Sequence, residues 1–269
     1  MRTIKLTIEY DGTNYCGWQI QPNGPTIQQA VETALSAITG ETVQVVSSGR
    51  TDSGVHARGM VAHFQTLKNL PLTAFREGVN SKLPADIAVV EAEEVAAAFH
   101  ARYSALAKKY RYSICLGQVR SPLSIRHAWQ FNKALDIEAM RLASSSLVGK
   151  HDFAAFRSSG CDAKTTVREI YHIGIKKHGT MLHIDIIGSG FLRNMVRVIT
   201  GTLVEIGTGS RSADEMENLL QSGDRDLTGV TAPPQGLSLI KVWYEGDQKA
   251  WISREKRCNS CQKSLDKVT

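Results

Sequence analysis

The chain has 269 residues, of which 42% are hydrophobic, and it carries 32 Lys and Arg against 26 Asp and Glu, a formal net charge of +6. Because domains usually run about 100 to 200 residues, this length predicts two domains. The basic charge favours a polyanionic partner, since Lys and Arg that neutralise phosphates release condensed counterions. Five cysteines, odd in number and mostly scattered, exclude a disulfide framework in a chain this long.

The N-terminal stretch MRTIKLTIEYDG alternates apolar and charged residues, whereas a signal peptide has an uninterrupted apolar core. No run in the sequence approaches the roughly 18 apolar residues that a membrane helix needs. We therefore expect a soluble, cytoplasmic protein with no membrane partner.

The first half of the chain predicts the element order β-α-β-β-α-β. Ile4, Leu6 and Ile8 alternate with polar residues as in a strand. Thr26 has the spacing of a capping box before a helical apolar stripe, and Gly40 ends that stripe. Two strands, a short helix and a strand complete this half, over 42–46, 60–65, 73–80 and 87–91.

The second half predicts the same order with one added helix. It opens with a strand over 108–115, in which Tyr110, Tyr112 and Ile114 share one face. The remaining elements are a helix over 137–147, strands over 167–175 and 182–187, helices over 191–206 and 213–220, and a last strand over 237–244. The repeat is one of topology and not of sequence.

Two split-βαβ halves of the ferredoxin-like type can pack as lobes and leave a groove between them. We therefore predict an α/β fold of the α+β type with mainly antiparallel sheets and a central cleft. The predicted domains are 1–105 and 106–245. A polar, lysine-rich tail over 246–269 has the composition of a disordered segment.

The stretch GRTDSGVHA, from Gly49 to Ala57, places one carboxylate, Asp52, in a glycine-flanked loop between two predicted strands. An Asp in such a loop can be an ordinary Asx-turn residue. A carboxylate that a rigid sheet positions can also act as a nucleophile or base, provided that it is ionised. Composition and spacing leave both interpretations open.

The run GRTDSGVHA resembles the nucleophile loop of the pseudouridine synthases, in the form found in the branch that modifies the tRNA anticodon stem-loop. Four other segments also resemble this family and occur in the family's order along the chain, one before this loop at 8–22 and three after it at 99–112, 191–201 and 235–244. The resemblance implies a groove lined by both halves, isomerisation of uridine at tRNA positions 38, 39 and 40, and a homodimer with the RNA lying across both subunits. Only the last two dozen residues look unlike the family.

The same resemblance implies roles for individual residues. Asp52 matches the catalytic carboxylate, and Arg197 matches the arginine that pairs with it and keeps it charged. Tyr110 matches the tyrosine that contacts the target uracil. Arg50 matches an arginine that helps to hold the target nucleotide out of the stem, and Leu237 matches an apolar residue at the edge of the base pocket.

Some of these assignments have a structural alternative. Arg197 could be a surface arginine extending over an apolar helix stripe, and Tyr110 could be a core residue of its strand. Arg58 is a further substrate-binding candidate, although it could, like His56 and His63, be structural. The basic residues around Tyr110 suit RNA, because an extruded base can stack on the ring while phosphates meet the cations, here Lys108, Lys109 and Arg111.

Other motifs in the sequence are incomplete. Asp52-Ser53-Gly54 is also the motif of aspartic proteases, which need two carboxylates sharing a proton, and no second copy exists. The segments 9–13 and 188–190 lack the nucleophilic Asp of a phosphatase loop and the third glycine of a dinucleotide loop. Cys258 and Cys261 make half a zinc site, and we expect no metal there.

The function predicted from these observations is pseudouridine synthesis in the tRNA anticodon stem-loop. No cofactor is expected, because the reaction has no net redox change and Asp52 supplies the nucleophile. The alternatives are a pseudouridine synthase for another RNA and an RNA-binding protein that has lost its chemistry. The intact set of Asp52, Tyr110 and Arg197 argues against the second alternative.

Overall fold

The computed structural model describes residues 1–158, 160 and 163–247. Cys258 and Cys261 of the predicted tail lie outside the described residues. Within the described part of the chain, no helix is both long and apolar enough to cross a membrane.

The first half has the predicted order of elements, with a short π-helical turn as its second helix. The predicted cap of the first helix is confirmed, because the Thr26 side chain accepts a hydrogen bond from the Gln29 backbone N–H. Gly40 ends that helix in the left-handed conformation, at φ 68°. The elements are β1 (Arg2–Tyr10), α1 (Ile27–Thr39), β2 (Val46–Ser47), β3 (His56–Thr66), η1 (Ala74–Gly78) and β4 (Ile87–Val95).

The strand predicted over 42–46 is wrong, because only the two residues of β2 pair with β3. The backbone N–H groups of Val43 and Val45 donate instead to side chains of α1, namely Ser36 Oγ at 3.2 Å and Glu32 Oε1 at 2.9 Å. Both valines are buried. The β-branched alternation in this segment therefore reflects packing beside α1 and not strand pairing.

The second half contains the predicted strands and helices and several short elements that the sequence did not reveal. The helix predicted over 191–206 begins later, at Met195, because Asn194 at its N-cap adopts the left-handed conformation with φ 60°. The elements are β5 (Ala107–Leu116), β6 (Trp129–Phe131), α2 (Ile137–Ser145), β7 (Gly149–Asp152), η2 (Ala154–Phe156), β8 (Val167–His178), β9 (Met181–Gly188), α3 (Met195–Gly207), α4 (Glu215–Ser222), η3 (Arg225–Leu227), η4 (Pro234–Gly236) and β10 (Leu237–Trp243).

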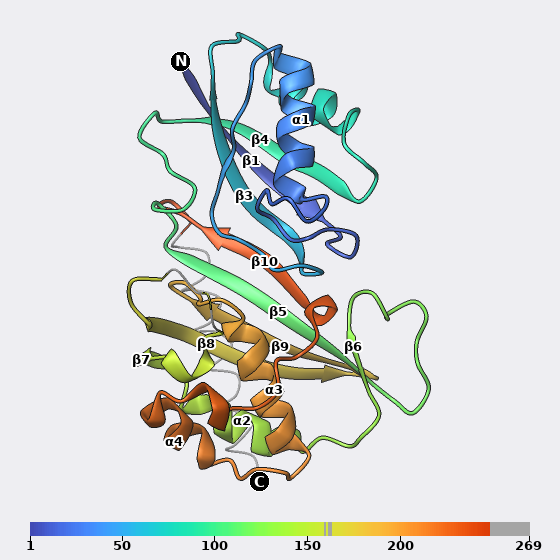
Figure 1. Cartoon of the computed structure of the whole chain (residues 1–269), viewed down its shortest axis with the longest axis vertical. Coiled ribbons are helices and arrows are strands. Elements are labelled where there is room, and N and C mark those ends of the chain that lie inside the picture. The colour runs from blue at the N-terminus through green and yellow to red at the C-terminus, as the bar shows by residue number, and fades with distance from the viewer. Residues whose placement is uncertain (159, 161–162, 248–269) are drawn as a thin grey trace, which may run out of the picture.

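Both halves share one sheet, whose main strand order is β4-β1-β3-β10-β5-β9-β8-β7. Most neighbours are antiparallel, so the predicted mixed fold with mainly antiparallel pairing is confirmed. β10 is last in the chain but central in the sheet, where it runs parallel to β3 and antiparallel to β5. It therefore joins the two halves, as Figure 1 shows.

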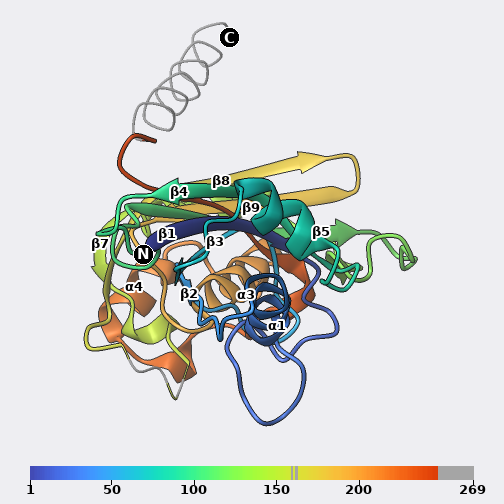
Figure 2. The same cartoon turned by 90° about the horizontal axis from the view of Figure 1, so that it is seen from above.

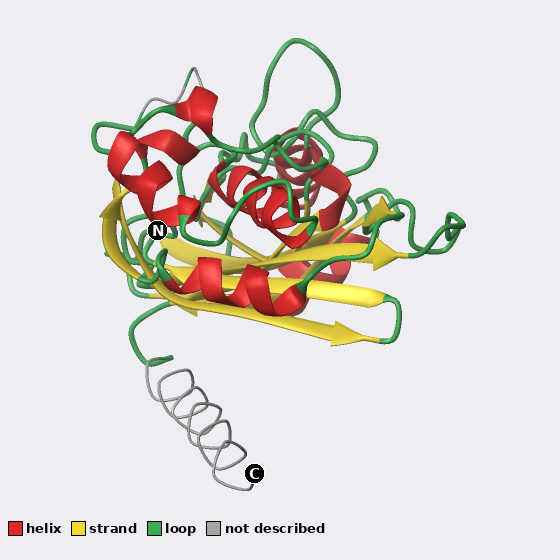
Figure 3. Cartoon of the chain, turned by 90° about the horizontal axis from the view of Figure 1, so that it is seen from below, coloured by secondary structure: helices red, strands yellow, loops and turns green. Residues whose placement is uncertain are grey.

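The helices α1 and α3 lie on the same side of the sheet (Figure 2), and Figure 3 shows the strands as one twisted layer. β10 and β5 cross the molecule between these helices. The helix α3 packs closely on the segment that precedes η4, because a Cβ at Gly201 would lie only 1.7 Å from the Val230 carbonyl oxygen. A glycine is therefore required at this crossing. This close packing fixes α3 against the segment that leads to η4 and β10.

Candidate active site

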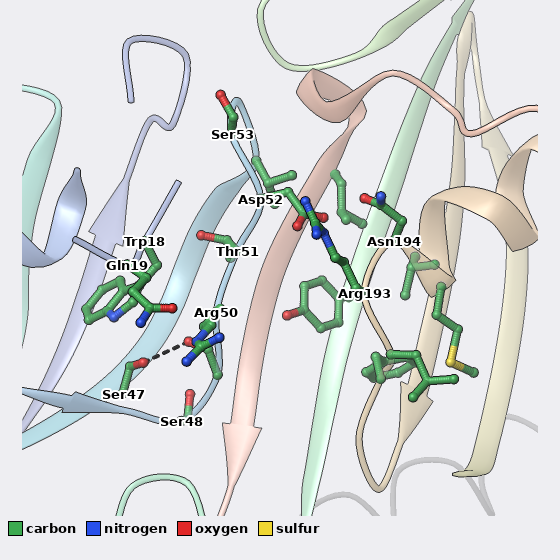
Figure 4. Close-up of a pocket in the computed structure, with 18 of the residues that line it drawn as sticks. Trp18, Gln19, Ser47, Ser48, Arg50, Thr51, Asp52, Ser53, Arg193 and Asn194 are labelled. Atoms are coloured by element: carbon green, nitrogen blue, oxygen red, sulfur yellow. Dashed lines mark hydrogen bonds between the residues drawn. The ribbon is translucent and has the colours of Figure 1, made fainter. Parts of the chain in front are cut away.

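A cleft lies over the middle of the sheet and is lined by residues of both halves. One wall comes from the loop between β2 and β3, and the other from the segment that leads into α3. Figure 4 shows Asp52 and Arg50 on the first wall and Arg193 and Asn194 on the second, with β10 and β5 between them. The predicted residues Tyr110, Arg197 and Leu237 line the same cleft as Asp52 and Arg50.

Hydrogen bonds to the first strand and its following turn hold the Asp52 loop in place. The Thr51 hydroxyl lies 2.8 Å from the Tyr10 hydroxyl, and the Thr51 carbonyl accepts from the Trp18 backbone N–H at 3.1 Å. On the other side of Asp52, the Ser53 hydroxyl donates to the Tyr15 carbonyl at 3.1 Å. The loop is therefore fixed on both sides of the carboxylate, and the Asp52 side chain is a third exposed.

Arg197 extends from α3 towards this carboxylate. Its Nη1 atom lies 3.8 Å from Asp52 Oδ2, and its side chain is 15% exposed. Its Nε–H donates to the Ala232 carbonyl at 2.7 Å, and its Nη1–H donates to Asn194 Oδ1 at 2.8 Å. The guanidinium is thus oriented by two other groups and reaches across the cleft to the opposite half.

The electrostatics of this pair are set by burial and by nearby cations. Burial raises the pKa of Asp52, and the charges of Arg197 and Arg193 oppose that rise without cancelling it. Burial likewise lowers the pKa of Arg197, against the influence of Asp52. The ionised state of the carboxylate, which a nucleophile requires, therefore depends on the two arginines.

Tyr110 lies on β5 at the floor of the cleft and is 9% exposed. Its ring meets Phe191 edge to face, with centroids 5.2 Å apart. Burial, followed by the charge of Asp52, raises the pKa of the Tyr110 hydroxyl, which keeps the phenol neutral. Leu237, at the start of β10, is paired with the neighbouring β5 residue Tyr112 and adds an apolar surface.

Cations dominate the charge of the cleft. Among the described residues that line it, Asp52 is the only carboxylate. The lining cations are Arg50, Arg102, Lys108, Arg168, Arg193 and Arg197. Such a surface attracts a polyanion, and it places the single carboxylate where that polyanion would lie.

Other basic candidates lie away from the cleft. Arg58 is exposed on β3 and is not among the residues that line the cleft. Lys109 and Arg111 alternate with Tyr110 along β5 and therefore point to the opposite face of the sheet. There Lys109 Nζ lies 2.8 Å and Arg111 Nε 2.6 Å from the carboxylate of Asp185. The expectation that both lie beside the tyrosine ring is therefore wrong.

The two histidines near the loop are structural. His56 is buried, its Nδ1 accepts from the Gly12 backbone N–H at 3.0 Å, and its Nε2 lies 3.2 Å from the Gln235 carbonyl. His63 Nδ1 accepts from the Ala101 backbone N–H at 3.2 Å. These contacts connect β3 to other segments and leave neither ring in the cleft.

Asp11, His56 and His127 form a group whose ligand atoms all lie within 4.8 Å of one another. The backbone contacts of His56 account for both of its ring nitrogens, so this residue is not poised to bind a metal ion. Asp11 also accepts from the Thr13 backbone N–H at 2.9 Å. We therefore interpret the group as part of the hydrogen bonding that supports the Asp52 loop.

Some cleft residues could not be identified from the sequence. Arg102 and Arg168 come from the β4 to β5 connection and from β8, and only the folded sheet brings them to the same cleft. Arg193 was expected on a helix, but it precedes α3 and is exposed. No local sequence pattern distinguishes these three arginines from ordinary surface arginines.

A cleft with one carboxylate among six cations fits an enzyme that acts on a polyanion. Residues 6–104 and 143–245 match the family model described as tRNA pseudouridine synthase. The chain belongs to this family, and it is accordingly an isomerase.

Individual relatives resemble the chain over most of its length. Proteins named tRNA pseudouridine synthase A in Citrifermentans bemidjiense and Geobacter sp. strain M21 are both 58% identical to it, over 91% of this chain and 98% and 99% of their own. The protein of that name in Geobacter sulfurreducens is 51% identical, over 91% of this chain and its own full length.

Proposed function

We propose that the protein converts uridine to pseudouridine at positions 38, 39 and 40 of the tRNA anticodon stem-loop, with Asp52 as the catalytic nucleophile. The observation that carries this proposal is the pair of Asp52 and Arg197 beside Tyr110 in a cleft lined by cations. Family membership supports the reaction, and resemblance to the anticodon branch supports the position of the target.

The reaction breaks the bond between C1′ and N1, rotates the uracil, and joins C1′ to C5. N1 gains a proton and C5 loses one, so the atoms balance without an added reagent. Asp52 attacks the sugar or the base and is released when the new bond has formed. The Arg197 guanidinium, 3.8 Å away, favours the ionised carboxylate that begins this sequence.

The target base must leave the helical stack before it can reach Asp52, and extrusion costs a few kcal/mol. Tyr110 offers a ring at the cleft floor against which the uracil packs, and Leu237 borders it. Arg50, on the same loop as Asp52, also lines the cleft, and we assign to it the role of holding the extruded nucleotide. By resemblance, we also propose a cytoplasmic homodimer across which the tRNA lies.

The test is to incubate the protein with unmodified tRNA transcripts that have a single uridine at position 38, 39 or 40, and to map pseudouridine by mass spectrometry. We expect modification at each of these positions and none in a transcript that lacks all three uridines. Modification at another site would assign the protein to a different RNA target. Tight binding without any product would favour the non-catalytic alternative.

A further inference from the structure

Lys108 is a cleft lysine that has no carboxylate partner among the described residues. It lies two residues before Tyr110 on β5 and therefore shares its face of the sheet. Its Nζ donates to the Ser48 carbonyl at 2.6 Å, which uses one of the three N–H donors of an ammonium group. Two donors remain for a ligand.

The surroundings of Lys108 repel positive charge. The charged groups that act on it are Arg102, from the β4 to β5 connection, and Arg168, from β8. Arg50 and Asp52 line the same cleft from the loop before β3. Burial, followed by the two arginines Arg102 and Arg168, lowers the pKa of Lys108 to about 8. Arg168 Nη1 also donates to the Thr165 and Val167 carbonyls at 2.9 and 2.6 Å. An anion bound next to Lys108 would offset the cost of burying its charge near two guanidinium groups.

We propose that Lys108, Arg102 and Arg168 form a phosphate subsite that holds a backbone phosphate next to the extruded nucleotide. Lys108 lies about 6.6 Å along the strand from Tyr110, two residues at about 3.3 Å each, which is on the scale of one nucleotide. An RNA chain carries one phosphate for each nucleotide, so a phosphate lies at about this distance from an extruded base. Its oxygens can accept hydrogen bonds from all three cationic side chains. The inference rests on the proposed RNA substrate and adds the contact that positions it.

The neighbouring glycine makes room for this group. A Cβ at Gly49 would lie 3.2 Å from Lys108 Nζ, closer than ordinary van der Waals contact. Gly49 also leads directly into Arg50 and Asp52. A phosphate on Lys108 would therefore sit beside the backbone that carries the catalytic loop.

Lys109 provides a matched control, because it is the next residue in the same strand but pairs with Asp185 on the opposite face. The test compares Lys108→Met and Lys109→Met for binding of a synthetic anticodon stem-loop RNA across a series of salt concentrations. We expect Lys108→Met to weaken binding about tenfold and to make the slope of log affinity against log salt shallower by about 0.7 to 0.9. Lys109→Met should leave both quantities close to wild type.

A second comparison locates the phosphate. Replacing single phosphates near the target uridine with neutral methylphosphonates should weaken binding to the wild type at one position. At that position the replacement should not weaken binding to Lys108→Met any further. Binding by the wild type, but not by Lys108→Met or Lys108→Arg, should also weaken as pH rises through about 8, because only the lysine loses its proton there.

The alternative role for Lys108 is to position the Ser48 carbonyl. In that case Lys108→Met would slow the single-turnover rate at saturating RNA while affinity, salt slope and the methylphosphonate effect stayed as in wild type, and the proposal would be overturned. Pseudouridine mapping on the wild type separates failure of the phosphate-subsite proposal from failure of the proposed function. A normal product map with no Lys108 effect on binding would refute the subsite alone.

Discussion

Arg197 offers the clearest test of how the carboxylate is kept ionised. Two unit charges 3.8 Å apart interact by about 1 kcal/mol in bulk water and by about 4 kcal/mol at an effective dielectric constant near 20. Asp52 is a third exposed and Arg197 is mostly buried, so a value of about 2 to 3 kcal/mol is appropriate. Since about 1.4 kcal/mol is a factor of ten, Arg197→Gln should lower the single-turnover rate roughly 100-fold at pH values below the wild-type pKa of Asp52.

The loss of single-turnover rate in Arg197→Gln should depend on pH. Burial already raises the pKa of Asp52, and removing a cation raises it further. Because the reaction needs the ionised form, the rate rises as pH increases through this pKa, and the acid limb of Arg197→Gln should lie at higher pH than that of wild type. Arg197→Lys keeps the charge and should return the limb towards the wild-type position.

The assay is single-turnover pseudouridine formation at saturating tRNA over a range of pH, with tRNA affinity measured in parallel. Glutamine can still donate to the Ala232 carbonyl, so the local packing is largely kept. An acid limb at the same pH in wild type and Arg197→Gln would refute the ion-pair account. A defect in affinity alone would show that Arg197 is a phosphate contact.

Three further predictions follow from the cleft and the packing. Tyr110→Ala should weaken binding of substrate RNA by about 1 to 3 kcal/mol, because stacking on the ring is lost. Tyr110→Phe keeps the ring and should bind RNA within a few-fold of wild type. Equal binding by the wild type and both variants would exclude stacking. RNA affinity should fall with a log–log salt slope of roughly −3 or steeper, because several lining cations meet phosphates, and a salt-independent affinity would contradict this. Gly201→Ala should lower the free energy of unfolding by at least about 1 to 3 kcal/mol, since its Cβ would lie 1.7 Å from the Val230 carbonyl oxygen. Gly78→Ala, whose Cβ would lie 3.6 Å from the Ile38 side chain, is the control in denaturant unfolding and should cost much less.

The periodic elements of this fold could be predicted from the sequence, because their burial patterns follow strand or helix spacing. The cap formed by Thr26 and the alternation along β5 are local features, and both are present as expected. The segment 42–46 shows the limit of such patterns. Its alternating valines are buried, but their backbone N–H groups donate to side chains of α1 and not to a neighbouring strand. Short strands such as β6 carry too few residues for any periodicity.

Part of the site could be predicted because some of its residues lie in recognisable local sequences. Asp52 is marked by its own loop sequence, and the resemblance implies Arg197 as its partner, which the structure places 3.8 Å from the carboxylate. Lys108 and Lys109 cannot be told apart by composition, although alternation along β5 separates them in the fold. Arg102 and Arg168 reach the cleft only through strand pairings that join distant parts of the chain.

The most direct test of the central claim is to measure pseudouridine formation by Asp52→Asn under single-turnover conditions, with tRNA affinity measured on the same preparation. The substitution keeps the size of the side chain and removes the charge, while the hydrogen bonds of Thr51 and Ser53 hold the loop. We expect no detectable product and an affinity within a few-fold of wild type, because one carboxylate performs the chemistry and many cations bind the RNA. Retention of more than a few per cent of the wild-type rate would contradict the assignment of Asp52 as the nucleophile.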